Sequence, residues 1–332
     1  MNRILRSNMM EITGFLMIGL ALLLLSYSIH FKLPLDLPAS LLNLNSIFLS
    51  ILIEALPFVL IGVLVAGCIQ IFVTEDHIQK WIPKNKGMAV IMSCTIGALF
   101  PACECGIVPI VRRLIGKGVP IHAAIGFMLT GPLINPVVIA STYMAFGNNM
   151  KMAGLRMGLG FMIALMAAFA VSRLFKGNQL KAAIKSTSSP EHPKQHSFTN
   201  RFWSMLTHSI DEFFDMGKYL VIGAFIAAAV QTYMPARALL ETGSGPASSL
   251  LVMMGLAYIL SLCSEADAFI GASFSSIFPQ ASILGFLIFG PMMDLKNTIM
   301  MLSVFRWRFV MAVLLLIVSI VFFTLMMVQT FI

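Results

Sequence analysis

Two short stretches of the sequence combine cysteines with carboxylates inside otherwise apolar segments. They are Pro101-Ala102-Cys103-Glu104-Cys105-Gly106 and Cys263-Ser264-Glu265-Ala266-Asp267. Thiolates bind soft metal ions in preference to hard cations. An ionised carboxylate in hydrocarbon costs about 3 kcal/mol or more, so acidic residues rarely persist there without a role. Together these residue types predict a site for a soft metal, a metalloid or another thiol-reactive solute.

Three of the five cysteines are candidate substrate ligands, and also candidate metal ligands: Cys103, Cys105 and Cys263. On a continuous helix, residues two apart point about 200° away from each other. Cys103 and Cys105 could therefore converge only on an unwound tip. The other two, Cys68 and Cys94, are interpreted as small apolar packing residues. An odd number of cysteines, none of them in a polar loop, argues against a disulfide framework.

A second set of candidates consists of carboxylates within apolar segments. A carboxyl group in a low dielectric keeps its proton more readily than one in water, so it can load a proton near neutral pH. Release of that proton can then be coupled to solute movement. Four residues are predicted to have this proton-coupling role: Glu104, Glu265, Glu54 and Asp267. Asp215, near the end of its segment, is equally compatible with an interfacial position.

Glycine and proline interrupt several of the apolar segments. Proline removes a hydrogen bond from a helix and glycine weakens the helix. Six residues are predicted to break helices in this way: Pro101, Gly106, Gly131, Pro132, Gly290 and Pro291. Asn135 and Asp294 follow the two Gly-Pro pairs at the same spacing. We expect both of these side chains to bind substrate in one cavity.

The elements that must position these residues are membrane segments. The chain has 332 residues, of which 58% are hydrophobic and only 11% charged, and its mean hydropathy is +0.91. Soluble domains carry about 25% charged residues, so this composition cannot cover a water-facing surface. Apolar runs of about 20 residues are long enough to cross a bilayer. They lie at Met9–Ile29, Ile47–Val73, Met88–Val111, Val119–Phe146, Met152–Val171, Phe213–Tyr233, Leu250–Ala272, Pro279–Val304 and Phe309–Ile332.

Two halves of the chain resemble each other across a polar connector. The Gly-Pro pairs recur at a shift of 159 residues, which also aligns Asn135 with Asp294, and a shift of 161 residues aligns Glu104 with Glu265. Secondary transporters are commonly built from duplicated halves, with the substrate site at their interface. The predicted division is an N-terminal transmembrane helix and loop (1–46), a first repeat (47–172), a cytoplasmic connector (173–208) and a second repeat (209–332).

The distribution of Lys and Arg distinguishes two topologies, because cytoplasmic loops carry an excess of both residues. If all nine segments cross fully, nine of these residues lie inside and ten outside. If the third and seventh segments are re-entrant hairpins, sixteen lie inside and three outside. The charges therefore predict an all-α integral membrane protein with inverted repeats, two re-entrant hairpins and a cytoplasmic N-terminus. The alternative is a bundle of 8–9 full transmembrane helices.

The motifs also carry a family resemblance. At Phe100–Gly106, Gly131–Pro136 and Cys263–Asp267 the chain resembles the bacterial predicted-permease family that includes the organoarsenical efflux permeases. The resemblance extends from about Ile47 to Arg308. It implies a polytopic inner-membrane permease without a bound cofactor, and it fixes no substrate by itself.

The leading hypothesis is a transporter rather than an enzyme. It would be a multi-pass permease of the bacterial inner (plasma) membrane that exports a soft metal, metalloid or thiol-reactive small solute, such as an arsenical, driven by protons. Its expected partners are that solute and the lipid bilayer, with a soluble or membrane partner subunit left open and no nucleic acid. No Walker-type motif is present, so ATP drive would need another subunit.

Two other hypotheses stay open at this point. The chain could be a transmembrane thiol oxidoreductase that passes reducing equivalents through Cys103, Cys105 and Cys263, which requires a pair cycling between dithiol and disulfide. It could also be a membrane subunit that transports nothing itself and serves a soluble partner.

Overall fold

The computed structural model describes residues 18–19, 39–73, 78, 82–83, 85–100, 103–175, 177, 179–181, 198–233 and 245–330. Within these residues the regular elements are helices, and the one β-type pairing found there is a bridge between Leu180 and Phe305. The predicted all-α architecture is therefore confirmed for this part of the chain. Three predicted features lie outside the described residues: most of the helix Met9–Ile29, the residue Pro101, and most of the connector.

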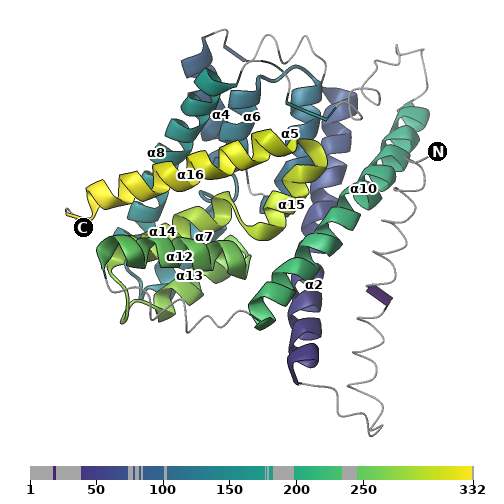
Figure 1. The fold of residues 1–332 in the computed structure, drawn as a ribbon. Coiled ribbons are helices and arrows are strands. Elements are labelled where there is room, and N and C mark those ends of the chain that lie inside the picture. Colours follow the sequence, from purple (N-terminus) through teal and green to yellow (C-terminus); the bar gives the residue numbers. More distant parts are fainter. Residues whose placement is uncertain are drawn as a thin grey trace, which may run out of the picture.

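The helices of the described part are α2 (Ala39–Phe72), α4 (Lys86–Leu99), α5 (Glu104–Gly116), α6 (Ile121–Thr130), α7 (Pro136–Ala145), α8 (Met150–Leu174), α10 (Phe198–Tyr233), α12 (Pro246–Leu260), α13 (Ser264–Ser273), α14 (Gln280–Met292), α15 (Leu295–Val304) and α16 (Trp307–Val328). Figure 1 shows α2 and α10 crossing at one side of the bundle, with α16 lying across its front.

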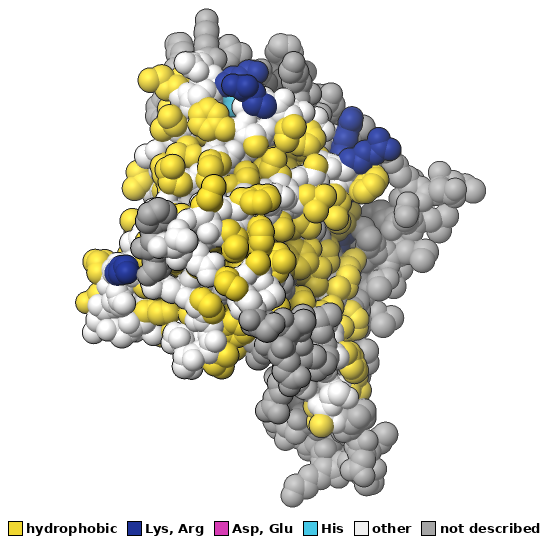
Figure 2. Space-filling view, turned by 60° about the vertical axis from the view of Figure 1, so that its left-hand side comes forward, with side chains coloured by type: hydrophobic (Ala, Val, Ile, Leu, Met, Phe, Trp, Pro, Cys, Tyr) yellow, Lys and Arg dark blue, Asp and Glu magenta, His cyan; other side chains and the backbone are white. Residues whose placement is uncertain are grey.

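Several helical segments have the length and composition of membrane spans. Five are long and apolar enough to cross a bilayer: Ala39–Ile71, Met150–Leu174, Met205–Tyr233, Gln280–Val304 and Trp307–Val328. Figure 2 shows hydrophobic side chains over the middle of one face, with Lys and Arg clusters near its upper edge. Large exposed apolar side chains such as Ile53, Met162 and Phe323 are suited to lipid tails rather than to water. The chain is thus a multi-pass membrane protein.

The first predicted hairpin is formed by α4 and α5, which lie on either side of α6. α4 runs parallel to α6 and α5 runs antiparallel to it. The contacts that fix these directions are Cys94 with Gly126, Gly97 with Thr130, and Ile107 with Gly131. Lys86 at the start of α4 and Gly118 just after α5 line the same cavity. The chain therefore enters and leaves this segment at the same end of the molecule, as a re-entrant hairpin must.

The second hairpin is formed by α12 and α13 and repeats this geometry around α14. α12 runs parallel to α14 and α13 returns antiparallel to it. The contacts that fix these directions are Leu250 with Gly285, Ala257 with Gly290, Asp267 with Gly290, and Gly271 with Leu287. The four hairpin limbs have 14, 13, 15 and 10 residues. Each is shorter than the roughly 20 residues that cross a bilayer, so these segments are not full transmembrane helices.

The two halves have the same order of elements and opposite directions. Each consists of a long helix, a hairpin, a broken helix and another long helix: α2, α4–α5, α6–α7 and α8, then α10, α12–α13, α14–α15 and α16. α2 and α10 run antiparallel, because Val63 of α2 contacts Ser209 of α10 while Phe48 contacts Phe225. This is the predicted inverted arrangement. The repeat boundaries 47–172 and 209–332 stay a prediction.

The two Gly-Pro pairs end their helices differently. α6 ends at Thr130 with Gly131 as its C-cap, as predicted. Gly290 and Pro291 instead lie within the last turn of α14, and the break follows after Met292. Pro291 lacks the N–H that would bond the carbonyl of Leu287. That carbonyl accepts a hydrogen bond from Arg156 Nε at 3.1 Å, which compensates for the missing donor.

Gly106 does not break a helix, contrary to the prediction, because it lies inside α5. A Cβ atom at Gly106 would lie 2.7 Å from the carbonyl oxygen of Phe58 in α2. A Cβ atom at Gly62 of α2 would in turn collide with the backbone of Gly106. Glycine at both positions lets the two helices approach closely, and this close packing is the physical reason for Gly106.

Candidate functional site

The two hairpin tips and α2 enclose a cavity of about 30 Å³, room for about one water molecule. The tips contribute three residues each: Cys103, Glu104 and Cys105 from the first, and Cys263, Ser264 and Glu265 from the second. α2 adds Glu54 and α15 adds Lys296. Residues 160 positions apart in the sequence therefore meet at one place, as the inverted repeat predicts.

The three cysteines predicted to converge do so at the starts of two helices. Cys103 is the N-cap of α5 and Cys263 is the N-cap of α13, where its sulfur accepts a hydrogen bond from Ala266 N at 3.4 Å. The side chains of Cys103 and Cys105 interact directly. Cys263 interacts with the carboxylate of Glu54 across the cavity. All three thiols are free.

The other two cysteines lie away from the cavity. Cys68 is exposed on α2 and its sulfur lies 3.7 Å from the sulfur of Met205. Cys94 is buried in α4 against Gly126 and Ala168. The position of Cys94 matches the interpretation as a packing side chain, whereas Cys68 lies on the surface of the helix bundle.

Two carboxylates are buried without hydrogen-bond partners in the described part of the chain. Glu104 is 4% exposed and Asp267 is fully buried, and neither carboxylate has a partner for either oxygen. Asp267 lies directly against the backbone of Gly290. Unpaired buried carboxylates are costly. Their presence at the tips of both hairpins is consistent with the predicted proton-coupling role of these residues.

The remaining two predicted carboxylates are more accessible. Glu54 is exposed on α2 and lines the cavity. Glu265 is half-buried, and the hydroxyl of Ser264 lies 3.4 Å from its Oε2. The cavity therefore has one buried and two partly accessible acids along its wall, which is a suitable arrangement for passing protons between water and the interior.

Lys296 is a cation at this site that the sequence reasoning did not select. It is 6% exposed, and its Nζ lies 3.5 Å from Asp294 Oδ2 and 3.3 Å from the carbonyl oxygen of Ser261. It also interacts electrostatically with Glu104. Its position inside an apolar segment could have identified it, because burying a lysine in the membrane costs about as much free energy as burying an acid.

Asn135 and Asp294 occupy equivalent positions, as their spacing predicts, but they act as helix caps. Asn135 caps α7 by accepting a hydrogen bond from Val138 N at 2.8 Å. Asp294 caps α15 by accepting one from Asn297 N at 2.5 Å. Neither residue lines the small cavity. Asp294 reaches it through the side chain of Lys296, whereas Asn135 is not brought there.

Arg156 is a second buried cation that the sequence reasoning did not select. It extends from α8, is 2% exposed and donates three hydrogen bonds. The acceptors are Leu287 O at 3.1 Å, Thr142 Oγ1 at 2.6 Å and Ser264 O at 3.0 Å. It also interacts electrostatically with Asp267. Arg156 thus joins α7 and α8 of the first half to the hairpin tip and broken helix of the second.

Two further observations show which residues and which kind of metal centre the site does not include. Asp215 is exposed and forms an ion pair with Lys218 at 2.6 Å, so it lies outside the site. Among the described residues, no group of three or more His, Cys, Asp or Glu side chains is arranged to hold a metal ion. The three thiols share a cavity without forming a closed metal site, so their role as metal ligands stays a prediction.

Comparison with known proteins gives a consistent result. A family model described as a predicted permease, ArsP_1, matches residues 40–330. A Bacillus subtilis protein, UPF0718 protein YcgR, is 53% identical over 285 residues, which cover 85% of this chain and 96% of that protein. A Streptococcus mutans protein named "Putative two-component membrane permease complex subunit" is 42% identical over 275 residues, 83% of this chain and 91% of that protein.

A more distant relative comes from an archaeon. UPF0718 protein MJ0584 of Methanocaldococcus jannaschii is 23% identical over 160 residues, 46% of this chain and 43% of that protein. No solved structure matches the chain.

Proposed function

The chain belongs to the predicted permease family, and from this premise we propose that it exports a soft metal ion, metalloid or thiol-reactive small solute in exchange for protons. Membership of a permease family makes it a transporter rather than an enzyme. The site between the two hairpin tips is the proposed substrate site.

One observation carries the choice of substrate class. Cys103 and Cys105 of the first tip and Cys263 of the second line the same small cavity. Sulfur ligands select soft ions and thiophilic species over hard cations. Because the ligands come from both inverted halves, movement of one half against the other would let a solute pass from one set of thiols to the other.

Proton coupling is supported by the carboxylates beside these thiols. Glu104 lies in the wall of the cavity and has no hydrogen-bond partner among the described residues. A carboxyl group of this kind can bind a proton when the site faces one side of the membrane and release it on the other. Glu54 and Glu265, which also line the cavity, provide the proposed route to water.

Replacing single cysteines tests the substrate site. Serine is close in size to cysteine but is a much poorer ligand for soft metals. We expect Cys103→Ser, Cys105→Ser and Cys263→Ser each to reduce growth of the expressing strain on trivalent arsenicals, copper, zinc or tellurite. The reduction should occur for at least one of these solutes and with normal abundance in the membrane.

The matched controls are Cys68→Ser and Cys94→Ser, which lie outside the cavity. We expect both to retain resistance. A triple variant of Cys103, Cys105 and Cys263 that exports every tested solute at the wild-type rate would exclude the thiols as ligands. Glu54, Asp267 and Asp294 would then become the better candidates for a polar substrate site.

A thiol oxidoreductase is the second candidate, because the side chains of Cys103 and Cys105 interact directly. Such an activity needs a disulfide that forms and is reduced during turnover. Alkylation of free thiols in membranes, with and without a reductant, would distinguish the two functions. The permease predicts the same number of free thiols under both conditions.

A partner subunit is proposed from the name of the Streptococcus mutans relative, which describes one subunit of a two-component permease complex. Flux measured in liposomes that contain this chain alone would test the need for a partner. Undiminished flux compared with whole cells would exclude an obligatory second component.

We propose that the chain lies in the bacterial inner membrane with its N-terminus in the cytoplasm. The hairpins then place Lys117 on the cytoplasmic side and Gln280 on the opposite side. Cysteines introduced at these positions in a cysteine-free background can be probed with an impermeant maleimide. Labelling at position 117 from outside intact cells would contradict this orientation.

A further inference from the structure

A cavity with polar side chains in its wall, the polar cavity, lies at the open end of the first hairpin, at the other end of α4 and α5 from the hairpin tip. It has a volume of about 400 Å³. Its lining includes Lys86 at the start of α4, the turn Gly118-Val119-Pro120, and Ile121 and His122 at the start of α6. Because α4 and α6 run parallel, the N-terminal ends of two helices meet at this cavity.

The first turn of α6 has unused backbone donors. Its N-cap is Pro120, which provides no side-chain hydrogen bond, and the first bond along the helix runs from Ala124 N to Pro120 O at 3.0 Å. The N–H groups of Ile121, His122 and Ala123 have no acceptor in the described part of the chain. Free N–H groups at a helix start, together with the positive end of the helix dipole, favour an anion.

His122 supplies a second and independent sign of a ligand. Its side chain lines the cavity, the residue is only 8% exposed, and its Nε2 has no hydrogen-bond partner among the described residues. An unsatisfied buried polar group is costly, and a bound acceptor would remove this cost. Lys86 is close enough to His122 for its positive charge to act on the imidazole, so the cavity wall is cationic.

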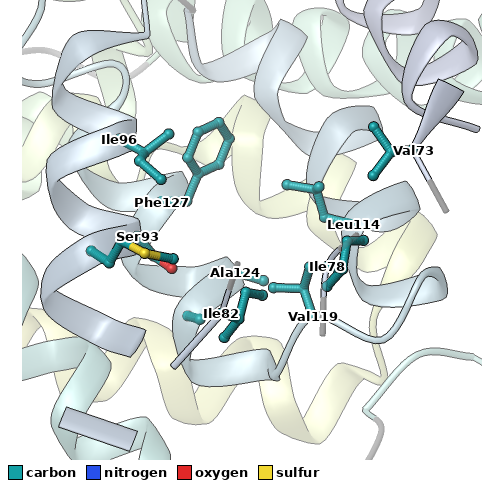
Figure 3. A pocket seen from close by; sticks show the side chains of 11 residues that line it. Val73, Ile78, Ile82, Ser93, Ile96, Leu114, Val119, Ala124 and Phe127 are labelled. Atoms are coloured by element: carbon teal, nitrogen blue, oxygen red, sulfur yellow. The ribbon is translucent and has the colours of Figure 1, made fainter. Parts of the chain in front are cut away.

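An apolar cavity of about 400 Å³ adjoins the polar one, and the two share Val119. It lies between α4 and α5 over α6, and Figure 3 shows the side chains around it, including Ile96, Leu114 and Phe127, directed toward a common open space. Its wall is almost entirely hydrocarbon. A small soluble anion would leave this second cavity empty.

We propose that the two cavities together bind an anionic phospholipid of the surrounding leaflet. The phosphate group accepts hydrogen bonds from the first turn of α6 and from His122, with Lys86 as its counter-ion, and one acyl chain occupies the apolar cavity. Lys117 follows at the same end of α5, and basic residues of this kind attract anionic lipid headgroups. The neighbouring Arg112 and Arg113 are paired with Glu212 of α10 and are not assigned to the headgroup. The bound lipid would hold the two limbs of the first hairpin apart at their open end.

Thermal unfolding of the delipidated, detergent-solubilised full chain, with three added probes, tests the proposal. The probes are dioleoylphosphatidylglycerol, dioleoylglycerol with the same chains but no phosphate, and inorganic phosphate. We expect a rise in Tm with phosphatidylglycerol alone. Native mass spectrometry should show one retained phosphatidylglycerol molecule per chain.

Substitutions in each cavity test its contribution to lipid binding. Lys86→Gln with His122→Gln is expected to weaken phosphatidylglycerol binding about tenfold or more, because the phosphate loses the charge of Lys86 and the hydrogen bond from His122. Lys151→Gln, at the start of α8, is the matched control and should bind normally. Ile96→Trp, at the partly exposed mouth of the apolar cavity, should weaken binding of the lipid and leave any effect of inorganic phosphate unchanged.

Two results would overturn the proposal. A Tm shift with inorganic phosphate as large as with the lipid, unaffected by Ile96→Trp, would show a site for a free phosphate anion. Equal phosphatidylglycerol binding by the wild type, by Lys86→Gln and by His122→Gln would exclude this cavity as the headgroup site. Lys86 is exposed, so its replacement leaves the packing of the helices unchanged.

Discussion

The two hairpin tips occupy equivalent places in the two halves, yet they are held in different ways. At the second tip, Arg156 donates to Ser264 O at 3.0 Å, Lys296 donates to Ser261 O at 3.3 Å and Gln231 donates to Leu260 O at 2.5 Å. At the first tip, Glu104 has no hydrogen-bond partner among the described residues. Side chains from other helices thus anchor the backbone of the second tip, whereas no such bond is found to the described residues of the first. Each tip also has a buried carboxylate without a hydrogen-bond partner in the described part of the chain, Glu104 at the first and Asp267 at the second.

The first hairpin is positioned by backbone packing instead of by polar anchors. α5 lies against α2 at Gly62 and Gly106, where a Cβ atom on either residue would collide with the backbone of the other helix. In the second half, Gly223 corresponds to Gly62, and a Cβ atom there would lie 3.4 Å from Lys296 O, an ordinary contact. The contact at Gly223 is with α15, so the close backbone approach that holds the first hairpin against α2 has no counterpart at this glycine of α10. Side-chain donors, two of them buried cations, anchor the second tip instead.

Removing Arg156 should cause the largest loss of stability among the substitutions that test this difference between the two tips. Arg156→Met leaves the carbonyls of Leu287 and Ser264 without their donor and leaves Asp267 with Lys296 as its remaining cation. Breaking a buried ionic network from one side costs about 3–5 kcal/mol, so we expect a large fall in Tm of the detergent-solubilised protein. Arg156→Lys keeps the charge but loses the planar fork, and an intermediate value is expected.

The control for Arg156 is Arg173→Met, an exposed arginine in the last turn of the same helix. It should unfold at the wild-type temperature. Equal Tm values for the two methionine variants would show that the second tip does not depend on the cation.

Substitution of the paired glycines should have the next largest effect. Gly62→Ala pushes α2 away from α5 and should cost about 1–3 kcal/mol, as overpacking usually does. Gly223→Ala meets only ordinary contacts, and alanine favours a helix by about 1 kcal/mol, so its stability should be unchanged or raised. Thermal unfolding of both variants measures the difference.

Gly116→Ala is the control within α5, because no atom lies within 4 Å of a Cβ atom placed there. A loss of stability in this variant would mean that α5 tolerates alanine poorly even where there is space for it. We expect it to behave like Gly223→Ala. If Gly62→Ala and Gly223→Ala lose equal stability, the two halves are packed alike and the proposed asymmetry is wrong.

The smallest effect on stability and the sharpest effect on function are expected at the acids of the two tips. Glu104→Gln keeps the shape of the side chain and removes its proton exchange. It should leave Tm almost unchanged and reduce proton-coupled flux about tenfold, equivalent to about 1.4 kcal/mol. Glu265→Gln, at the anchored and more accessible tip, should reduce flux less. Wild-type flux with unchanged pH dependence in both variants would remove these acids from the mechanism.

Much of the architecture could be predicted from the sequence because its signals are local. Apolar runs, the count of Lys and Arg on each side and the placement of glycine and proline are sufficient to predict a helical membrane protein with two hairpins. Asn135 and Asp294 were predicted to be equivalent from spacing alone, and both cap the helix that follows. The convergence of Cys103, Cys105 and Cys263 followed from the same inverted arrangement.

Only the tertiary structure decided how the site is held together. Arg156 bonds the carbonyl of Leu287, 131 residues away in sequence, because Pro291 has no N–H to offer it. Gly106 packs against α2 instead of breaking its own helix, and Lys296 turns toward Asp294. Sequence patterns specify which segments enter the membrane and where they bend. Which buried charge meets which freed backbone group depends on contacts between distant segments, and these exist only in the folded chain.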